Sequence, residues 1–230
     1  WAPVNVGATR LPTKIYPVTN DRREWITLTA EQVQSNFEQQ GYQFQWGRKI
    51  PFRPSLDGSM SIDKVTFTSI DEYLYYEDAV KPGYADDKFI VLNPSLSFTW
   101  FRYDNESILP PSIQAAGNIW PRQNDPCPAG WHIPTENDWK NFIAVTAGEK
   151  SGKPTNLIWE FASIPGFIVS LTSSIVDGDI SYNGSTAFWA STFRGYMMNP
   201  TCSFPFQNEL GVSVNTQLSG NANCIRCIQE

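Results

Sequence analysis

The sequence has little charge and almost no histidine. Its 230 residues include a single histidine, and Asp, Glu, Lys and Arg together make up 17%. The formal net charge is −6, and no stretch gathers lysine and arginine into a block. Because duplex binding depends largely on basic side chains that neutralise phosphates, we do not expect nucleic acid as a partner.

Long apolar runs and familiar catalytic signatures are also missing. No stretch approaches the roughly 20 apolar residues that a membrane helix needs, so we expect no transmembrane segment. The chain has no Gly-x-Ser-x-Gly, His-Glu-x-x-His or phosphate-loop motif. Its histidine, His132, lies in a proline-flanked turn, where a packed or surface role is commoner than a catalytic one. We expect no enzyme activity and no cofactor, although carboxylates from distant loops could converge as in glycosidases.

Aromatic residues and prolines are abundant instead. Aromatics make up 14% of the chain, with nine tryptophans, and there are 17 prolines. This composition is typical of a compact globule with irregular loops rather than of a disordered chain. A chain of this length forms one large domain or two small ones.

A rigid bend at residues 124–136 leads into a helix. Its prolines fix their own φ angles and hold the preceding residues extended. Thr135 is placed to cap the helix, with acidic residues in the first turn, where the helix dipole favours negative charge. Apolar residues then recur at helical spacing, at Trp139, Phe142 and Ile143.

Other elements follow from local patterns. A capping box at residues 29–32 and the glycine at position 41 predict a second helix between them. Residues 42–46 alternate in the strand period, which indicates a buried strand. We expect residues 202–228 to be loops that close with a final strand.

Residues 50–123 are broken into short pieces by seven prolines and carry two aromatic clusters. One hypothesis is a sugar-stacking surface, because aromatic rings cover apolar C–H groups while polar neighbours hold hydroxyls. The residues that it would use are Tyr75, Tyr76, Trp100, Phe101, Arg102 and Tyr103. The alternative is that these rings pack the segment onto the core, because large side chains usually bury most of their area.

Five short motifs occur along the chain in a fixed order. They read WAPVNVGAT at 1–9, GYQFQWGRK at 41–49, DPCPAGW at 125–131, FWAST at 188–192 and IRCI at 225–228. Together they resemble the Fibrobacter succinogenes major paralogous domain family of Bacteroidetes surface and fimbrial tip adhesins. The resemblance implies an α+β, C-type-lectin-like fold with a twisted antiparallel sheet, two main helices and long loop insertions.

The resemblance spans nearly the whole chain and sets the domain organisation that we expect. Residues 1–230 would be one domain with an insertion at about 50–123. Because the chain begins at Trp1 inside a motif, without Met or a signal peptide, we expect a C-terminal module of a longer exported protein. Its expected location is extracellular, at the bacterial cell surface or outer membrane.

The four cysteines are expected to form disulfides, as is usual for an even number in an exported domain. Cys224 and Cys227 are three apart and would point to opposite faces of a strand, so they should have different partners. Of the two pairings left, the resemblance implies the nested one, Cys127–Cys227 with Cys202–Cys224. A four-cysteine zinc site matches the spacing poorly.

Two activities known for related folds, calcium-dependent sugar binding and copper-dependent oxidation, are only weakly matched by motifs in this sequence. Calcium-dependent lectins use Glu-Pro-Asn or Gln-Pro-Asp motifs, which are absent; the acidic turn with Asp177 and Asp179 is a weak metal candidate, since such carboxylates are usually solvated. Formylglycine-generating oxidases use a cysteine pair and copper. Cys202 or Cys224 could be imagined in that role, but no other motif of that family is recognisable.

We therefore expect a non-enzymatic recognition or adhesion domain of a bacterial surface protein, possibly at a fimbrial tip. Its partner would be a host or bacterial glycan or a surface protein, bound through variable loops. The alternatives are a structural module that joins fimbrial subunits, and a relative of the formylglycine-generating oxidases.

Overall fold

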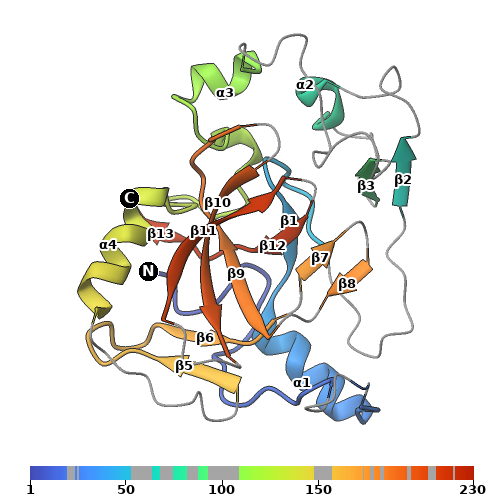
Figure 1. The fold of residues 1–230 in the computed structure, drawn as a ribbon, viewed down its shortest axis with the longest axis vertical. Helices are drawn as coiled ribbons and strands as arrows, with labels where there is room; N and C mark the ends of the chain where they lie inside the picture. The colour runs from blue at the N-terminus through green and yellow to red at the C-terminus, as the bar shows by residue number, and fades with distance from the viewer. Residues whose placement is uncertain are drawn as a thin grey trace.

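The computed structural model describes residues 1–230 except 20–23, 25, 53–63, 68–74, 82–87, 93–108, 148–156, 173, 177–178, 182–183, 196–197, 207–210 and 220. The described chain is a mixed α+β structure around a central sheet (Figure 1). Both chain ends lie on the same side of this sheet, close to α4.

In the described residues the central sheet has seven strands. Six follow the order β11-β10-β9-β12-β7-β8, and the seventh, β1, also pairs with β12. Within this sheet the described pairings are antiparallel, except that β12 runs parallel to β9. The strands are β1 (Gln43–Gln45), β7 (Ser174–Val176), β8 (Asp179–Ser181), β9 (Ser185–Trp189), β10 (Met198–Pro205), β11 (Ser213–Leu218) and β12 (Ala222–Cys224). Residues 202–228, predicted to be mostly loops, thus supply much of the sheet.

Short strand pairs and helices surround the sheet. The pairs are β2 (Lys64–Phe67) with β3 (Phe89–Leu92), β4 (Trp131–His132) with β13 (Ile228–Gln229), and β5 (Ile158–Glu160) with β6 (Ile168–Ser170). The helices are α1 (Ala30–Gln40), α2 (Tyr76–Ala79), α3 (Pro111–Ala115), α4 (Glu136–Thr146) and the 3₁₀ turn η2 (Arg122–Asn124).

The two longer helices begin where the sequence predicts. Thr29 caps α1 and Thr135 caps α4, and each forms a capping box with the residue three positions on. Gly41 ends α1 with φ of 75°, a region that side chains rarely adopt. The short helix α2 begins at Tyr76, and the residues directly before Tyr75 lie outside the described residues.

An ion cluster fixes the start of α4. Glu136 is buried and pairs with Lys140 at 2.7 Å, while Arg194 donates to both of its carboxylate oxygens. Partial burial favours the neutral acid, but the hydrogen bonds and charges of the two cations outweigh it, so the pKa of Glu136 lies below its ordinary value.

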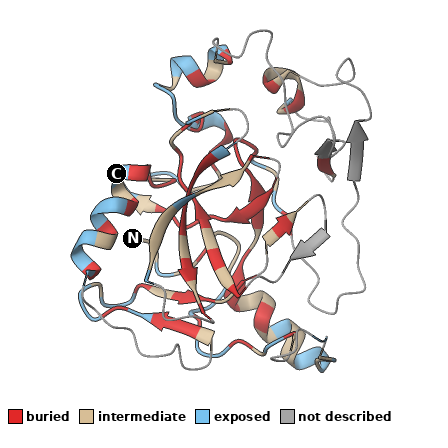
Figure 2. Ribbon diagram, viewed as in Figure 1, coloured by how far each residue is buried: buried red, intermediate tan, exposed pale blue. Residues whose placement is uncertain are grey.

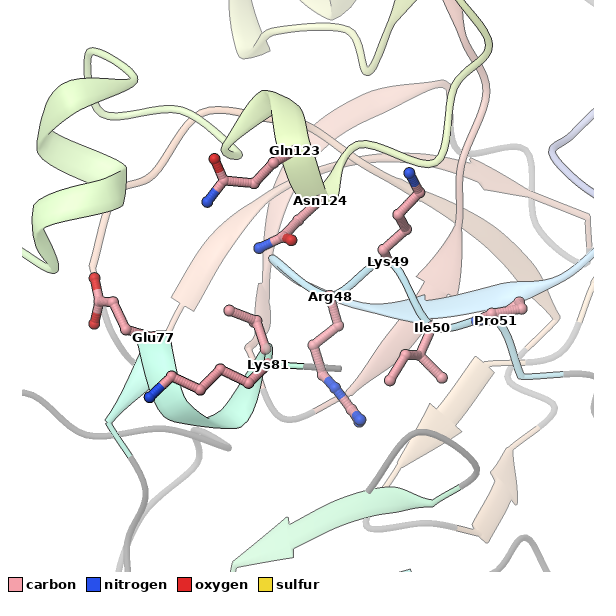
Figure 3. Close-up of a pocket in the computed structure, with 9 residues that line it drawn as sticks. Arg48, Lys49, Ile50, Pro51, Glu77, Lys81, Gln123 and Asn124 are labelled. Atoms are coloured by element: carbon pink, nitrogen blue, oxygen red, sulfur yellow. The ribbon is translucent and has the colours of Figure 1, made fainter. Parts of the chain in front are cut away.

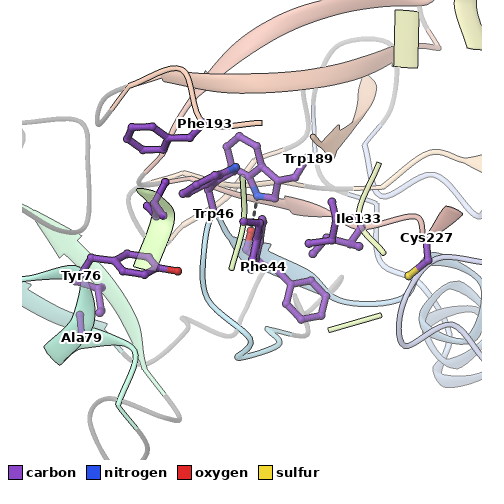
Figure 4. Close-up of a cluster of buried hydrophobic side chains, with 12 residues drawn as sticks. Phe44, Trp46, Tyr76, Ala79, Ile133, Trp189, Phe193 and Cys227 are labelled. Carbon is purple, nitrogen blue, oxygen red and sulfur yellow. Dashed lines mark hydrogen bonds between the residues drawn. The ribbon is translucent and has the colours of Figure 1, made fainter. Parts of the chain in front are cut away.

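The sheet separates two aromatic cores. On β9, Phe188 points to one face and Trp189 to the other, as alternation in a strand requires. The Phe188 side is covered by α4 and the β5–β6 pair, with Trp139 stacked on Phe188 at 5.6 Å between ring centroids. The Trp189 side is shown in Figure 4, where Trp189 donates to the Phe44 carbonyl at 2.6 Å. Strands β1 and β12 are buried throughout and β9 and β10 for the most part, whereas β11 is intermediate to exposed (Figure 2).

Much of the described part of the segment 50–123 packs onto the Trp189 side, while Phe52 and Phe89 form a separate cluster with Ile175 and Ala222. Buried side chains from α2, β3 and α3 join the core on the Trp189 side: Tyr76, Ala79, Ile90 and Ile113. The hydroxyl of Tyr76 donates to the Gly47 carbonyl at 2.8 Å and accepts from Asn124 at 3.1 Å. The assignment of Tyr76 to a ligand-binding surface is therefore wrong, because its ring anchors the segment to the core.

Side-chain amides replace strand pairing along the N-terminal segment. Asn36 of α1 both donates to the Tyr16 carbonyl and accepts from the Tyr16 N–H, each at 2.9 Å. Gln39 likewise donates to the Lys14 carbonyl at 2.9 Å and accepts from the Lys14 N–H at 3.0 Å. A carboxamide offers the same donor and acceptor as a peptide group, so α1 holds residues 14–16 extended without a neighbouring strand.

The two ends of the chain are fastened together. Cys127 and Cys227 form the predicted disulfide, with Cα atoms 5.9 Å apart. The buried guanidinium of Arg226 donates to Asn5 Oδ1 at 2.8 Å, to the Ala2 carbonyl at 2.9 Å and to the Ile168 carbonyl at 2.6 Å. Burial lowers the pKa of Arg226 to about 9, which leaves it charged at neutral pH.

The predicted Cys202–Cys224 disulfide is wrong, because both thiols are free and buried. Cys202 of β10 and Cys224 of β12 each lie opposite Phe188, on either side of β9. Strands are about 4.8 Å apart, which places the two Cα atoms about 10 Å from each other. A disulfide spans roughly 4.4–6.8 Å between Cα atoms, so the intervening strand prevents the bond.

Candidate ligand-binding cleft

A cleft of about 600 Å³ opens where three segments meet at the base of the insertion. The segments are the loop after β1, the helix α2 and the 3₁₀ turn η2 (Figure 3). This volume lies within the roughly 300–1,000 Å³ of typical small-molecule sites. The lining residues are Arg48, Lys49, Ile50, Pro51, Glu77, Val80, Lys81, Gln123 and Asn124.

The loop that forms one wall is closed by backbone pairing. After β1 the chain turns and returns, and Phe52 exchanges two 2.8 Å hydrogen bonds with Gln43. Gly47 begins the loop with φ of 84°, and a Cβ there would lie 2.8 Å from the Tyr76 ring. Residues 48–51 are thereby held between a fixed strand and a fixed return.

The Tyr76 hydroxyl joins this wall to the other two. It links Gly47, at the base of the loop, to Asn124 of η2, while the ring belongs to α2. Trp120 supports Asn124 by donating its indole N–H to the Asn124 carbonyl at 2.9 Å. Burial raises the pKa of Tyr76, so the hydroxyl keeps the proton that it donates.

The described lining carries three cationic side chains against one carboxylate. The Arg48 guanidinium is buried and donates to Gln45 Oε1 at 2.7 Å and to the Lys88 carbonyl at 3.1 Å. The carboxylate, Glu77, accepts from the backbone N–H and the hydroxyl of Ser112 at 3.3 and 3.1 Å. The lining is therefore net positive in a chain whose net charge is −6.

The two lysines of the cleft are accessible. Lys49 is exposed on the loop after β1. Lys81, just beyond α2, has a side chain that is 67% exposed and pairs with Asp78 at 2.5 Å. An ammonium group has three N–H donors, so Lys81 can keep this pair and still donate to a ligand.

The structure brings few of the predicted site residues together. Tyr75 is half-buried at the start of α2, directly before the buried Tyr76. The predicted cluster at Trp100, Phe101, Arg102 and Tyr103 lies outside the described residues. Lys49, Lys81 and Gln123 were not predicted, because they come from three distant segments and no spacing in the sequence links them.

The predicted metal site also finds no described support. Asp177 lies outside the described residues, and Asp179 begins β8 opposite Val176. Within the part of the chain that the structure describes, no group of three or more His, Cys, Asp or Glu residues is arranged to hold a metal ion.

The two free thiols are poorly suited to redox or nucleophilic chemistry. Cys224 Sγ accepts from the Gln43 amide at 3.2 Å and donates to Thr172 Oγ1 at 3.3 Å. Burial raises the pKa of Cys224 to about 11 and that of Cys202 well above its ordinary value. Since the thiolate is the reactive form, both groups are unreactive at neutral pH in the folded chain.

Comparisons with known proteins add little. No protein-family model matches the chain, and no solved structure matches it. It is similar to the uncharacterized membrane protein YtaB of Bacillus subtilis (strain 168), with 28% identity over 76 residues, a stretch that covers 33% of this chain and 47% of that protein. The match thus spans about half of the relative and does not define a family. Among the described residues, no helix has the length and apolar character to cross a membrane.

Proposed function

We propose that this chain is a non-enzymatic, extracellular recognition domain of a bacterial surface protein, of the Fibrobacter succinogenes major paralogous type with a C-type-lectin-like fold. Its task would be adhesion, through glycan bound in the cleft between the loop after β1, α2 and η2. The predicted site residues Trp100, Phe101, Arg102 and Tyr103, which lie outside the described residues, are further candidate contacts.

The observation that carries this proposal is the position of the cleft. It lies at the junction of a fixed frame and the insertion, since one wall follows β1 and the others come from α2 and η2. Ligand sites are commonly built from loops held by a rigid scaffold. The shared hydroxyl of Tyr76 keeps the three walls in register before any ligand arrives, which reduces the entropy lost on binding.

The frame beneath the cleft supports an extracellular role. A disulfide persists in oxidising compartments and is rare in the cytosol. Cys127 and Cys227 are 100 positions apart, so their bond constrains nearly half of the chain. The buried, protonated thiols of Cys202 and Cys224 argue against the oxidase alternative, which needs accessible and ionisable cysteines.

A glycan array with two tryptophan-substitution variants tests the proposal. Gln123→Trp places a bulky ring in the cleft at an exposed position, and Gln34→Trp places the same ring on the exposed face of α1 as the control. We expect reproducible glycan binding by the wild type and by Gln34→Trp, and its loss in Gln123→Trp. Trp100→Ala reports whether the insertion cluster contributes contacts.

Two results would contradict the proposal. The absence of glycan binding on the array, together with tight binding to surface or fimbrial subunits, would favour a structural assembly module. Glycan binding that both tryptophan variants retain would move the site away from the cleft.

A further inference from the structure

We propose that the ligand of the cleft is an acidic saccharide, whose carboxylate is attracted by the cationic lining and pairs with the ammonium group of Lys49 or of Lys81. This inference rests on the proposed glycan-binding function and specifies the chemistry of the same site. It starts from the contrast between a chain of net charge −6 and a described cleft lining in which cations outnumber carboxylates.

The two lysines approach the cleft from different walls. Lys49 belongs to the loop after β1 and Lys81 to the end of α2, and Figure 3 shows both among the lining side chains. Figure 3 shows the two ammonium groups pointing apart, so they offer an incoming carboxylate two separate places at which it can accept hydrogen bonds. Each such bond is charge-assisted and stronger than a bond between neutral groups.

Arg48 adds a fixed charge behind these two side chains. Its guanidinium is buried and held by Gln45 Oε1 and the Lys88 carbonyl, so it cannot swing out to meet the ligand. A cation in a wall of low polarity still attracts an anion in the adjoining hollow, since protein is less polarisable than water. Arg48 therefore contributes attraction at a distance rather than a hydrogen bond.

The only described carboxylate of the lining is already engaged. Glu77 accepts two hydrogen bonds from Ser112 at the start of α3, which holds it at the wall. Asp78, the partner of Lys81, is not among the lining residues. An incoming anion thus meets cations that remain able to donate.

The remaining polar groups favour a sugar as the carrier of the carboxylate. Gln123 and Asn124 contribute carboxamides, which donate and accept and so match hydroxyl groups. Ile50, Pro51 and Val80 give apolar surface for the C–H face of a ring. The hollow is a junction of three short segments and not a groove along a strand, which suits a compact terminal sugar better than an extended peptide.

The test compares charged and neutral versions of one ligand. The full chain is screened against sialylated, uronic-acid-containing and matched neutral oligosaccharides, and the strongest acidic saccharide is measured by calorimetry beside its methyl ester. The ester keeps the ring and removes the charge. We expect acidic saccharides to bind at least about tenfold more tightly than their esters, because the ester loses about one charge-assisted hydrogen bond. Their affinity should fall as salt screens the charges.

Charge-removing variants assign the effect to the cleft. At least one of Lys49→Gln and Lys81→Gln should weaken binding of the acidic saccharide about tenfold, because the carboxylate pairs with one of the two ammonium groups. The affinity for any neutral saccharide should change little. Lys140→Gln, on the exposed face of α4, is the control and should bind as the wild type does. Cooperative thermal unfolding of each variant would show that it folds.

The outcomes separate this inference from the function on which it rests. Equal affinity for acid and ester, or acidic binding that survives both cleft substitutions, would overturn the inference and leave glycan recognition standing. Binding of an acidic peptide but of no saccharide would overturn both. Selective loss of acidic-saccharide binding in at least one cleft variant supports both the inference and the proposed function.

Discussion

The disulfide between Cys127 and Cys227 should supply a large part of the stability of this chain. We consider replacing both cysteines with alanine, which removes the bond without introducing a new polar group. The bond closes a loop with a sequence separation of 100. In the chain-entropy model a loop of that length is worth about 4.7 kcal/mol. Domains are stable by about 5–15 kcal/mol in total, so the variant should be close to unfolding at moderate temperature.

Urea unfolding followed by tryptophan fluorescence measures this loss, because the chain has nine tryptophans and several line the two cores. The double variant and the reduced wild type should agree, apart from the packing lost with the sulfur atoms. Cys202→Ala is the matched control. Cys202→Ala should lower the free energy of unfolding by leaving a buried cavity, and this loss relative to the wild type should be the same with and without reductant.

Counting thiols in the same samples tests the cysteine assignment. In the native protein Cys202 and Cys224 should not react, since both are buried. In urea without reductant two thiols should react, and after reduction four. A loss of stability below about 1 kcal/mol in the double variant would refute the idea that this bond organises the fold. No reactive thiols in urea would mean that Cys202 and Cys224 are bonded.

Further predictions concern buried polar groups. Gln39→Glu should destabilise the chain by about 2–3 kcal/mol in urea unfolding, because a carboxylate cannot donate to the Lys14 carbonyl. Arg226→Met should cost about 3 kcal/mol, because it leaves the buried Asn5 Oδ1 and the part-buried Ala2 and Ile168 carbonyls without this donor. Arg10→Met, at an exposed ion pair, should cost under about 1 kcal/mol. Glu136→Gln should destabilise by about 1 kcal/mol above pH 4.5, the ordinary pKa of a glutamate. Because the folded-state pKa is lowered, this cost should disappear as pH falls through it; a cost that persists in thermal unfolding at low pH would show that packing, not charge, is responsible.

Features that local sequence determines were predicted correctly. The capping residues Thr29 and Thr135 fix where α1 and α4 begin, since a capping box involves only four consecutive residues. The strand at residues 43–45 was found from its period. The Cys127–Cys227 bond was inferred from motifs that lie at both of its ends.

Features that depend on strand order could not be predicted in the same way. The pairing of Cys202 with Cys224 fails because β9 lies between their strands, and nothing near either cysteine encodes that order. Tyr76 was assigned to a surface because a tyrosine pattern is the same for a stacking ring and for an anchoring one. Its burial depends on Gly47 and Asn124, which are 29 and 48 positions away.

The cleft shows why its own residues escaped prediction. Its walls are aligned by one phenol hydroxyl, whose partners belong to the loop after β1 and to η2. The side chains that face a ligand need only charge and reach, so Lys49, Lys81 and Gln123 share no motif. Residues that hold the fold, such as the capping residues Thr29 and Thr135, can be recognised in the sequence because their partners lie at fixed spacings. If that division holds, substitutions in the frame should change stability first, and substitutions in the cleft should change ligand affinity while stability stays constant.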